Sequence, residues 1–305
     1  MNANAGLRRD TVAVHDGEPC AVLAFYPTFE DEQATRLGAF TIDVAPGAPV
    51  MPERLPLVVL SHGSGGTPLV HRNLARHLAR AGHIVVLPTH PGNNRDDNPL
   101  AGTSRLLARR PAEIRIVIDW AMSADGFGAN LHPGAVGIVG HSLGGYTALA
   151  LAGGRPTSFP NESSDHVARP VPVAADPRVA AIVLLAPATV WFVADGALAD
   201  VRVPVLMYTG DADVQAPAEH GAIVERGMAG SGLLTHRVIA GAGHYSFFSP
   251  YPSDMVSPAL APSQDRPGFD RPALHAALYA EITTFVQRHL GLAVRAVTRG
   301  APGAG

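Results

Sequence analysis

The pentapeptide Gly140-His-Ser-Leu-Gly144 places one hydroxyl between glycines, after an apolar run at residues 136–139 and before a helix-like run that begins at Leu143. A strand that reverses sharply into a helix strains its central residue and crowds the flanking positions, so glycine is needed on both sides. The side chain of Ser142 would then stand exposed above the positive end of the helix. This context predicts that Ser142 is a nucleophile. The alternative is a glycine-rich turn that only packs a helix on a sheet.

A serine hydroxyl needs a base to take its proton, and His244 is the best-placed candidate. It stands in the segment AGAGHYS at 240–246, after the strand-like run at 237–239 and before the last helix-like run. In the chain order that this turn motif implies, the base follows the last strand. His141 leaves the turn in another direction from Ser142, so we expect it to be a buried packing residue.

The acid partner of the base is expected at a strand end between the serine and the histidine. Two carboxylates, Asp211 and Asp213, follow the strand-like run at 205–208. Asp213 fits the spacing G-x-x-D-x-x-x-P from Gly210 to Pro217 and is predicted to fix the tautomer of the imidazole. Asp211 is the rival, and one of the two aspartates could instead cap the helix that follows.

The turn SHGSGG at residues 61–66 could supply donors for an oxyanion, because it follows the apolar run at 57–60 and is rich in glycine. The backbone amides of Ser64 and Leu143 are the predicted pair. A glycine-rich turn can also cradle phosphate, but the chain has neither a Walker lysine nor any other lysine, which disfavours that interpretation.

These residues are carried by short apolar runs that alternate with helix-type periodicity. The alternation predicts an α/β fold with a mostly parallel central sheet of about eight strands, covered by helices on both faces. The expected strands are residues 21–26, 40–44, 57–60, 84–87, 136–139, 180–185, 205–208 and 237–239. The expected helices are residues 71–81, 104–122, 143–152, 216–228 and 272–289.

The domain organisation follows from the length of 305 residues, which suits one α/β domain, expected at residues 1–292. Two proline-rich connections, residues 153–177 and 247–267, are candidates for a lid or rim over the site, or for surface loops. Residues 293–305, which end in GAPGAG, are expected to be a disordered tail.

Composition excludes several classes of function. The net charge is −3 without a basic stripe, so no nucleic-acid partner is expected. Cys20 is the only cysteine, which excludes an intramolecular disulfide and favours a reducing compartment. The chain has neither the apolar stretch of a signal peptide nor a run long enough to span a membrane. We therefore expect a cytoplasmic protein. Its oligomeric state is left open between monomer and homodimer, and the chemistry expected of Ser142, His244 and Asp213 needs no metal or organic cofactor.

The order strand-HGSGG, GHSLGG, GDADVQAP and GAGH resembles the α/β-hydrolase superfamily. The blocks SHGSGG…LARAGHIVVLPTHPGNN, the later APA and GHYSFFSP are similar to bacterial relatives of dienelactone hydrolase and of platelet-activating-factor acetylhydrolase. The resemblance implies Ser142 as nucleophile, His244 as base and Asp213 as acid, with Ser64 and Leu143 as oxyanion donors. Characterised dienelactone hydrolases carry cysteine at the nucleophile position, so serine here favours ordinary ester hydrolysis.

The substrate is expected to be a small-molecule ester cleaved through an acyl-enzyme. Five aromatic residues near the site could form an apolar wall for it, or could serve the core instead: Trp191, Phe192, Tyr245, Phe247 and Phe248. The same catalytic residues would serve a lactone or amide hydrolase or an acyltransferase. A hydrolase-like protein that binds an acyl compound without cleaving it is a further alternative. A haloalkane dehalogenase is disfavoured, because that chemistry needs a carboxylate at position 142.

Overall fold

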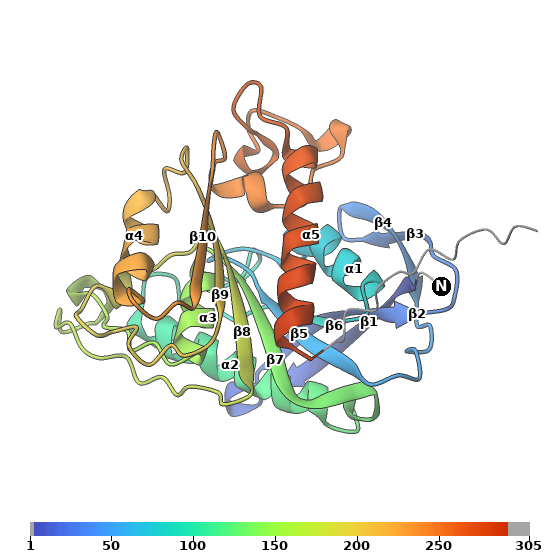
Figure 1. The fold of residues 1–305 in the computed structure, drawn as a ribbon, viewed down its shortest axis with the longest axis horizontal. Helices are drawn as coiled ribbons and strands as arrows, with labels where there is room; N and C mark the ends of the chain where they lie inside the picture. Colours follow the sequence, from blue (N-terminus) through green and yellow to red (C-terminus); the bar gives the residue numbers. More distant parts are fainter. Residues whose placement is uncertain (1–2, 292–305) are drawn as a thin grey trace, which may run out of the picture.

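The computed structural model describes residues 3–291, in which ten strands form one sheet (Figure 1). The strands are β1 (Asn4–Ala13), β2 (Pro19–Thr28), β3 (Gln33–Leu37), β4 (Phe40–Pro46), β5 (Leu55–Ser61), β6 (Ile84–Pro88), β7 (Leu131–His141), β8 (Val179–Leu185), β9 (Val205–Gly210) and β10 (Leu234–Ile239). Their order across the sheet is β10-β9-β8-β7-β5-β6-β2-β1-β4-β3.

Five α-helices and several short 3₁₀ helices connect the strands. The α-helices are α1 (Arg72–Arg80), α2 (Ser104–Met122), α3 (Leu143–Leu151), α4 (Ala218–Gly227) and α5 (Arg271–His289). The 3₁₀ helices are η1 (His15–Gly17), η2 (Pro68–His71), η3 (Gly128–Asn130), η4 (Pro160–Glu162), η5 (Val190–Phe192), η6 (His244–Phe247), η7 (Ser253–Met255) and η8 (Ala261–Ser263).

The strands that hold the site are parallel. β6, β5, β7, β8, β9 and β10 pair in parallel along one side of the sheet. On the other side β2 is antiparallel to β6 and to β1, and β3 is antiparallel to β4. The loops that leave the carboxyl ends of parallel strands meet at one edge of the sheet, where ligands bind in open α/β folds.

Helices cover both faces of the sheet, and side-chain alternation along the strands separates two cores. In β5, Leu57 and Val59 pack in the core that contains residues of α2, α3 and α4. Val58 and Leu60 pack in the core that contains residues of α1 and α5. Figure 1 shows α5 crossing the near face of the sheet, while α2 and α3 lie behind it.

The fold predicted from the sequence is confirmed, with ten strands in the described residues rather than about eight. The two that were missed are β1 and β3, whose sequences NAGLRRDTVA and QATRL are rich in polar and charged residues. β1 is antiparallel to β2 and parallel to β4, and β3 is antiparallel to β4. In this mixed side of the sheet a strand can expose one face to water and need not be continuously apolar. All five expected helices are present, and α2 has the predicted bounds. The expected disordered tail, residues 293–305, lies outside the described residues.

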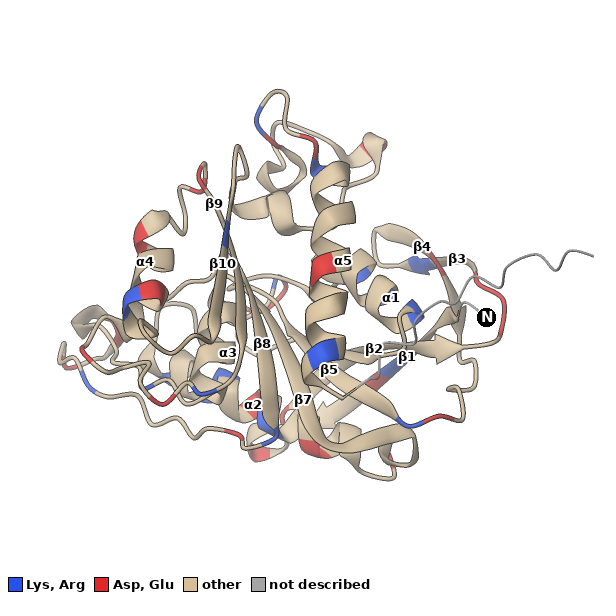
Figure 2. Cartoon of the chain, in the orientation of Figure 1, with Lys and Arg blue, Asp and Glu red and all other residues tan. Residues whose placement is uncertain are grey.

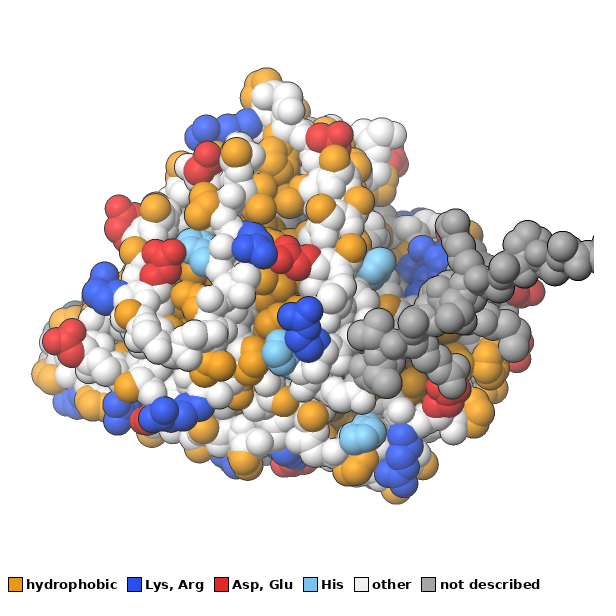
Figure 3. Space-filling view, viewed as in Figure 1, with side chains coloured by type: hydrophobic (Ala, Val, Ile, Leu, Met, Phe, Trp, Pro, Cys, Tyr) orange, Lys and Arg blue, Asp and Glu red, His pale blue; other side chains and the backbone are white. Residues whose placement is uncertain are grey.

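Charged residues of both signs are interspersed along the helices, strands and loops, as the colouring of Figure 2 shows. On the face in Figure 3 charged side chains lie between apolar side chains. Arg237 of β10 and Glu281 of α5 form an ion pair of 3.0 Å. No helix in the part of the chain that the structure describes combines the length and the apolar character that a membrane span requires.

Candidate active site

Ser142 occupies a strained turn between β7 and α3. Its φ of 53° and ψ of −118° lie outside the helical and extended regions, and its hydroxyl-bearing side chain is partly exposed. A Cβ on Gly140 would lie 2.1 Å from the carbonyl oxygen of Gly144, and a Cβ on Gly144 would lie 2.0 Å from that of Ser61. Both glycines are therefore required by close backbone approach. Backbone strain of this kind is concentrated at functional sites.

His244 and Asp213 form a hydrogen-bonded pair at the same edge of the sheet. Asp213 lies in the loop after β9, and His244 is the first residue of η6 after β10. The Nδ1 atom of His244 lies 2.7 Å from Oδ2 of Asp213. The other carboxylate oxygen of Asp213 accepts the amides of Gln215 and Ala216, each at 2.8 Å. Burial acts to raise the pKa of Asp213, but the bonds from His244 and these amides outweigh it and hold the pKa below its ordinary value.

Asp211, the alternative acid, is used differently. Its Oδ1 accepts the amide of Gly241 at 2.7 Å, so it fastens the loop that leads to His244 without touching the ring. Neither aspartate caps α4, because its N-cap is Pro217 and makes no side-chain cap bond.

Ser142 and His244 both line a cavity of about 400 Å³. The hydrogen bonds made by the described residues do not include one between the Ser142 hydroxyl and the His244 ring. In unliganded enzymes such bonds are often long and tighten only with substrate. Tyr245, Phe248 and Arg95 also line the cavity.

The two predicted oxyanion donors lie beside Ser142. A Cβ on Gly63 would be 3.1 Å from Cβ of Ser142, which shows how closely the 61–66 turn approaches the serine. Within residues 3–291, the amides of Ser64 and Leu143 donate no hydrogen bond to another group of the protein. Leu143 is the first residue of α3, where the amide has no partner within the helix. Both amides are thus free to bind a ligand oxygen.

His141 is buried as expected, and it also contacts the backbone of His244. Its Nε2 lies 3.0 Å from the carbonyl oxygen of His244, and the two rings are 4.8 Å apart. Burial, followed by the nearby charges of His244 and His71, lowers the pKa of His141 well below its ordinary value. His141 is therefore neutral and donates from Nε2. From the sequence we expected His141 to serve packing alone, and its position next to Ser142 is the signal that was available.

The aromatic residues predicted to contact substrate divide between the site and the cores. Tyr245 and Phe248 line the first cavity, and Trp191 lines a second cavity of about 270 Å³ that shares Ser64 and Ser142 with the first. The prediction does not hold for Phe192 and Phe247, which are each only 2% exposed and line neither cavity. Phe192 stacks on Tyr146 in the α2–α3 core, and Phe247 packs in the core under α5.

The two proline-rich connections both reach the site. Phe248, Tyr251, Met255, Leu260 and Pro262, all from residues 247–267, line the first cavity. From residues 153–177, Glu162 lines the second cavity, and its carboxylate accepts a hydrogen bond from Nε1 of Trp191 at 2.9 Å. Among residues 3–291 we find no group of three or more His, Cys, Asp or Glu side chains placed to hold a metal ion.

Comparisons with known proteins agree with this architecture. The family model described as the alpha/beta hydrolase fold matches residues 56–199. Among solved structures, a ferulic acid esterase from Streptomyces cinnamoneus superposes with a TM-score of 0.66 over 95% of this chain and 90% of that chain, at 19% identity. At that identity the likeness concerns the fold. A search of curated proteins finds no match to the sequence.

Proposed function

This chain has the α/β-hydrolase fold, and we propose that it is a serine hydrolase that cleaves carboxylic esters through an acyl-enzyme intermediate. The observation that carries the proposal is the convergence of a strained Ser142 and an Asp213-bound His244 on one cavity. The resemblance of the motifs to dienelactone hydrolase and platelet-activating-factor acetylhydrolase relatives supports the same reaction class.

The proposed acylation step uses five residues of the site. His244 Nε2 takes the proton of Ser142 as Oγ attacks the ester carbonyl carbon. The resulting oxyanion is bound by the amides of Ser64 and Leu143, while Asp213 holds the imidazole in the required tautomer and stabilises the imidazolium. The carbon–oxygen bond to the alcohol then breaks, and His244 delivers its proton to the departing alkoxide oxygen.

Deacylation repeats these steps with water. His244 takes a proton from a water molecule that attacks the acyl carbonyl, the same amides bind the oxyanion, and the proton returns to Ser142 as the acid leaves. The residues described here complete both half-reactions without a redox change.

The two cavities favour placing the alcohol group of the ester in one and the acyl group in the other. The leaving alcohol must lie on the side of the group that protonates it, and His244 lines the first cavity but not the second. We therefore place the alcohol group in the first cavity, among Tyr245, Phe248 and Tyr251, and the acyl group in the smaller cavity beside Leu107 and Trp191.

We further propose that residues 1–292 form a single domain, since every strand of residues 3–291 belongs to one sheet. In this domain residues 247–267 act as a rim of the substrate cavity, because five of them line it.

Hydrolysis of p-nitrophenyl esters tests the proposal. The Ser142→Ala variant is expected to lose measurable turnover. Ser231→Ala, which alters an exposed serine after α4, is the matched control and should keep wild-type activity. Undiminished turnover by Ser142→Ala would remove Ser142 from the mechanism. Activity on lactones or amides but on no ester would instead favour those alternatives, and no turnover of any of them would favour acyl binding alone.

The placement of the two ester halves has its own test. Trp191→Ala enlarges the second cavity and should shift the preferred acyl group to a longer one at constant alcohol. Tyr251→Ala enlarges the first cavity and should instead shift the preferred alcohol. The opposite pairing of variants and effects would reverse the assignment.

A further inference from the structure

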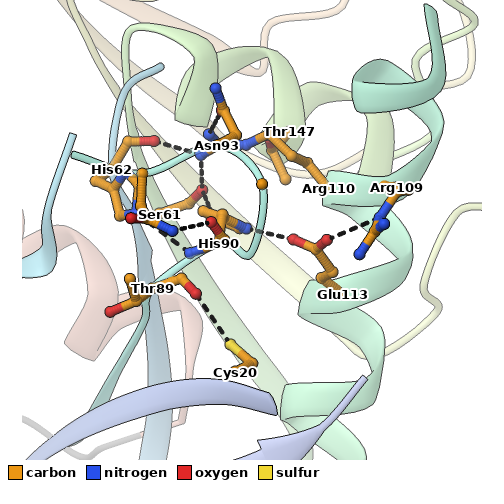
Figure 4. A network of polar contacts seen from close by, with 12 residues as sticks. Cys20, Ser61, His62, Thr89, His90, Asn93, Arg109, Arg110, Glu113 and Thr147 are labelled. Carbon is orange, nitrogen blue, oxygen red and sulfur yellow. Dashed lines mark hydrogen bonds and ion pairs between the residues drawn. The ribbon is translucent and has the colours of Figure 1, made fainter. Parts of the chain in front are cut away.

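A fully buried guanidinium lies beneath the turn that carries Ser64. The Arg110 side chain extends from α2 (Figure 4). It is 0% exposed. Its donors reach four neutral oxygens: Asn93 Oδ1 at 2.6 Å, Ser61 Oγ at 3.0 Å, Thr147 Oγ1 at 3.2 Å and the carbonyl of His62. Burial lowers the pKa of Arg110 to about 9, so the side chain is still a cation at neutral pH.

Among the residues that the structure describes, no carboxylate contacts Arg110 directly. Glu113, the acid on the same helix, is bonded instead to Nδ1 of His90 at 2.7 Å and paired with Arg109 at 3.4 Å (Figure 4). Burying a charge is costly unless its partners are well placed, and an apolar side chain would fill a core position more cheaply. The position of Arg110 therefore calls for a reason beyond packing.

A second buried polar contact, near Arg110, holds helix α2 against its neighbour α3. Pro111 has no amide hydrogen, so the Leu107 carbonyl lacks its usual helical donor. The Tyr146 hydroxyl of α3 donates to that carbonyl at 3.0 Å. This bond ties α2, at a position three residues before Arg110, to α3, the helix that follows Ser142.

Arg110 determines the orientation of the Asn93 amide. Asn93 Oδ1 accepts a hydrogen bond from the guanidinium, so Nδ2 of Asn93 must face the other partners of this amide. That nitrogen donates to Ser64 Oγ at 3.0 Å and to Asn98 Oδ1 at 2.7 Å. A chain of two hydrogen bonds thus connects the buried cation to the side chain of Ser64.

The backbone of the same turn is fixed from the other side. The Gly63 carbonyl accepts from Nδ1 of His62 at 2.7 Å and from the Gly66 amide at 3.1 Å. In a trans peptide the carbonyl and the next amide point in opposite directions, so these bonds also set the direction of the Ser64 N–H. Burial, with the charges of His90 and Arg110, keeps His62 neutral by lowering its pKa, which suits donation from Nδ1.

We propose that Arg110 and Asn93 are positioning residues that hold the Ser64 amide in place to bind the oxyanion. This inference rests on the proposed ester hydrolysis. Preorganised donors stabilise the oxyanion because they need not reorient when it forms. The expected consequence of loosening them is a loss in kcat with little change in KM, since the ground-state ester does not use the oxyanion contact fully.

A double-mutant cycle between Asn93→Ala and Ser64→Ala tests the proposal. Ser64→Ala keeps the backbone amide but removes the oxygen through which Asn93 acts. Rates are expressed per active site, titrated with a fluorophosphonate, so that unfolded protein does not contribute. We expect each single variant to lose about tenfold to a hundredfold in kcat, with KM changed less than about threefold. This is less than the roughly hundred- to thousandfold loss for a missing oxyanion donor, because the Ser64 amide is displaced and not removed.

The double variant should be no slower than the slower single variant, because both changes break one connection. Asn98→Ala is the matched control. It removes the other acceptor of the same Asn93 nitrogen without touching Ser64, and kcat should stay within about threefold of wild type. Arg110→Lys, which keeps the charge but not the planar fork, should lose kcat as Asn93→Ala does.

Two results would overturn the inference while leaving the proposed function intact. One is a double variant whose loss equals the product of the single losses, and the other is an Asn98→Ala variant as slow as Asn93→Ala. If Asn93→Ala does not fold, the cycle is run between Arg110→Lys and Ser64→Ala with the same criteria. Failure of the proposed function is recognised separately, by a wild-type enzyme that neither turns over esters nor reacts with the fluorophosphonate.

Discussion

The Nε2 atom of His141 lies 3.0 Å from the carbonyl oxygen of His244. The residue that precedes the proposed nucleophile therefore fastens the backbone of the proposed base, 103 positions further along the chain. Ser142 and His244 come from loops after different strands, and this bond limits how far the two loops can move apart. Asp213 holds the ring of His244, whereas His141 holds its main chain.

The first prediction concerns this contact. His141→Phe keeps an aromatic ring of similar size but removes the donor to His244. We expect kcat to fall by about ten- to a hundredfold, because a small misplacement of a catalytic group has effects of that size. Steady-state kinetics on a p-nitrophenyl ester provide the measurement. Wild-type kcat in a folded His141→Phe variant would show that the contact does not position the base.

The second prediction distinguishes the two aspartates. Asp213→Asn leaves the geometry nearly unchanged but favours the wrong imidazole tautomer, so kcat should fall by about 10⁴-fold. Asp211→Asn keeps an oxygen that can accept the Gly241 amide and should retain kcat within about threefold. The two variants are compared by the same ester assay. Equal losses, or a larger loss in Asp211→Asn, would contradict the assignment of Asp213 as the acid.

The third prediction concerns the turn at Ser142. Gly144→Ala would place a methyl group 2.0 Å from the Ser61 carbonyl oxygen, and both are main-chain positions that cannot rotate away. We expect the free energy of unfolding to fall by about 3 kcal/mol or more. Gly243→Ala is the control, because its Cβ would meet nothing closer than 3.9 Å and its φ is −95°. Urea unfolding should show a much smaller change for Gly243→Ala, and equal changes would refute the steric argument.

The fourth prediction concerns acid stability. His71 is 1% exposed, and neither of its ring nitrogens has a hydrogen-bond partner among residues 3–291. Burial, with the charges of His275 and Arg72, lowers its pKa from 6.5 to about 3. Between these values the unfolded chain binds a proton at this residue that the folded chain does not. The free energy of unfolding therefore falls as the pH drops below about 6.5, by up to about 1.4 kcal/mol per pH unit for this residue.

His71→Phe removes that proton uptake and leaves a ring that can still pack on Phe248. Urea unfolding at several values between about pH 4.5 and 7.5 measures how steeply the free energy of unfolding falls with decreasing pH. In the variant this slope should be shallower, by the uptake of up to one proton on unfolding. The same slope in both proteins would mean that His71 is not held neutral by burial.

Sequence reasoning succeeded where the determinant is local. The apolar runs of the parallel strands and the spacing of the helices predicted the sheet and its layers. The close approach of Gly140 and Gly144 follows from the turn itself. The G-x-x-D-x-x-x-P spacing favoured Asp213 over Asp211, and Asp213 is the aspartate that contacts His244 in the structure. These features depend on neighbouring residues and on the order of the elements.

Prediction from the sequence failed where the outcome depends on contacts between residues that are far apart in the chain. Phe192 and Trp191 are adjacent, yet one stacks on Tyr146 in the core and the other lines a cavity. Nothing in the sequence near Arg110 indicates that its side chain reaches Asn93, 17 positions away, and the turn at Ser61. The polar edge strand β3 was missed because its residues pair with β4 without forming an apolar pattern.

The central claim is that Ser142 is the nucleophile activated by His244. Mass spectrometry after reaction with a fluorophosphonate tests it most directly. We expect one added phosphonyl group per chain, located on the peptide that contains Ser142, no addition to Ser142→Ala, and greatly slowed addition to His244→Ala. Labelling of another residue, or equal labelling of Ser142→Ala, would contradict the assignment of Ser142 as the nucleophile.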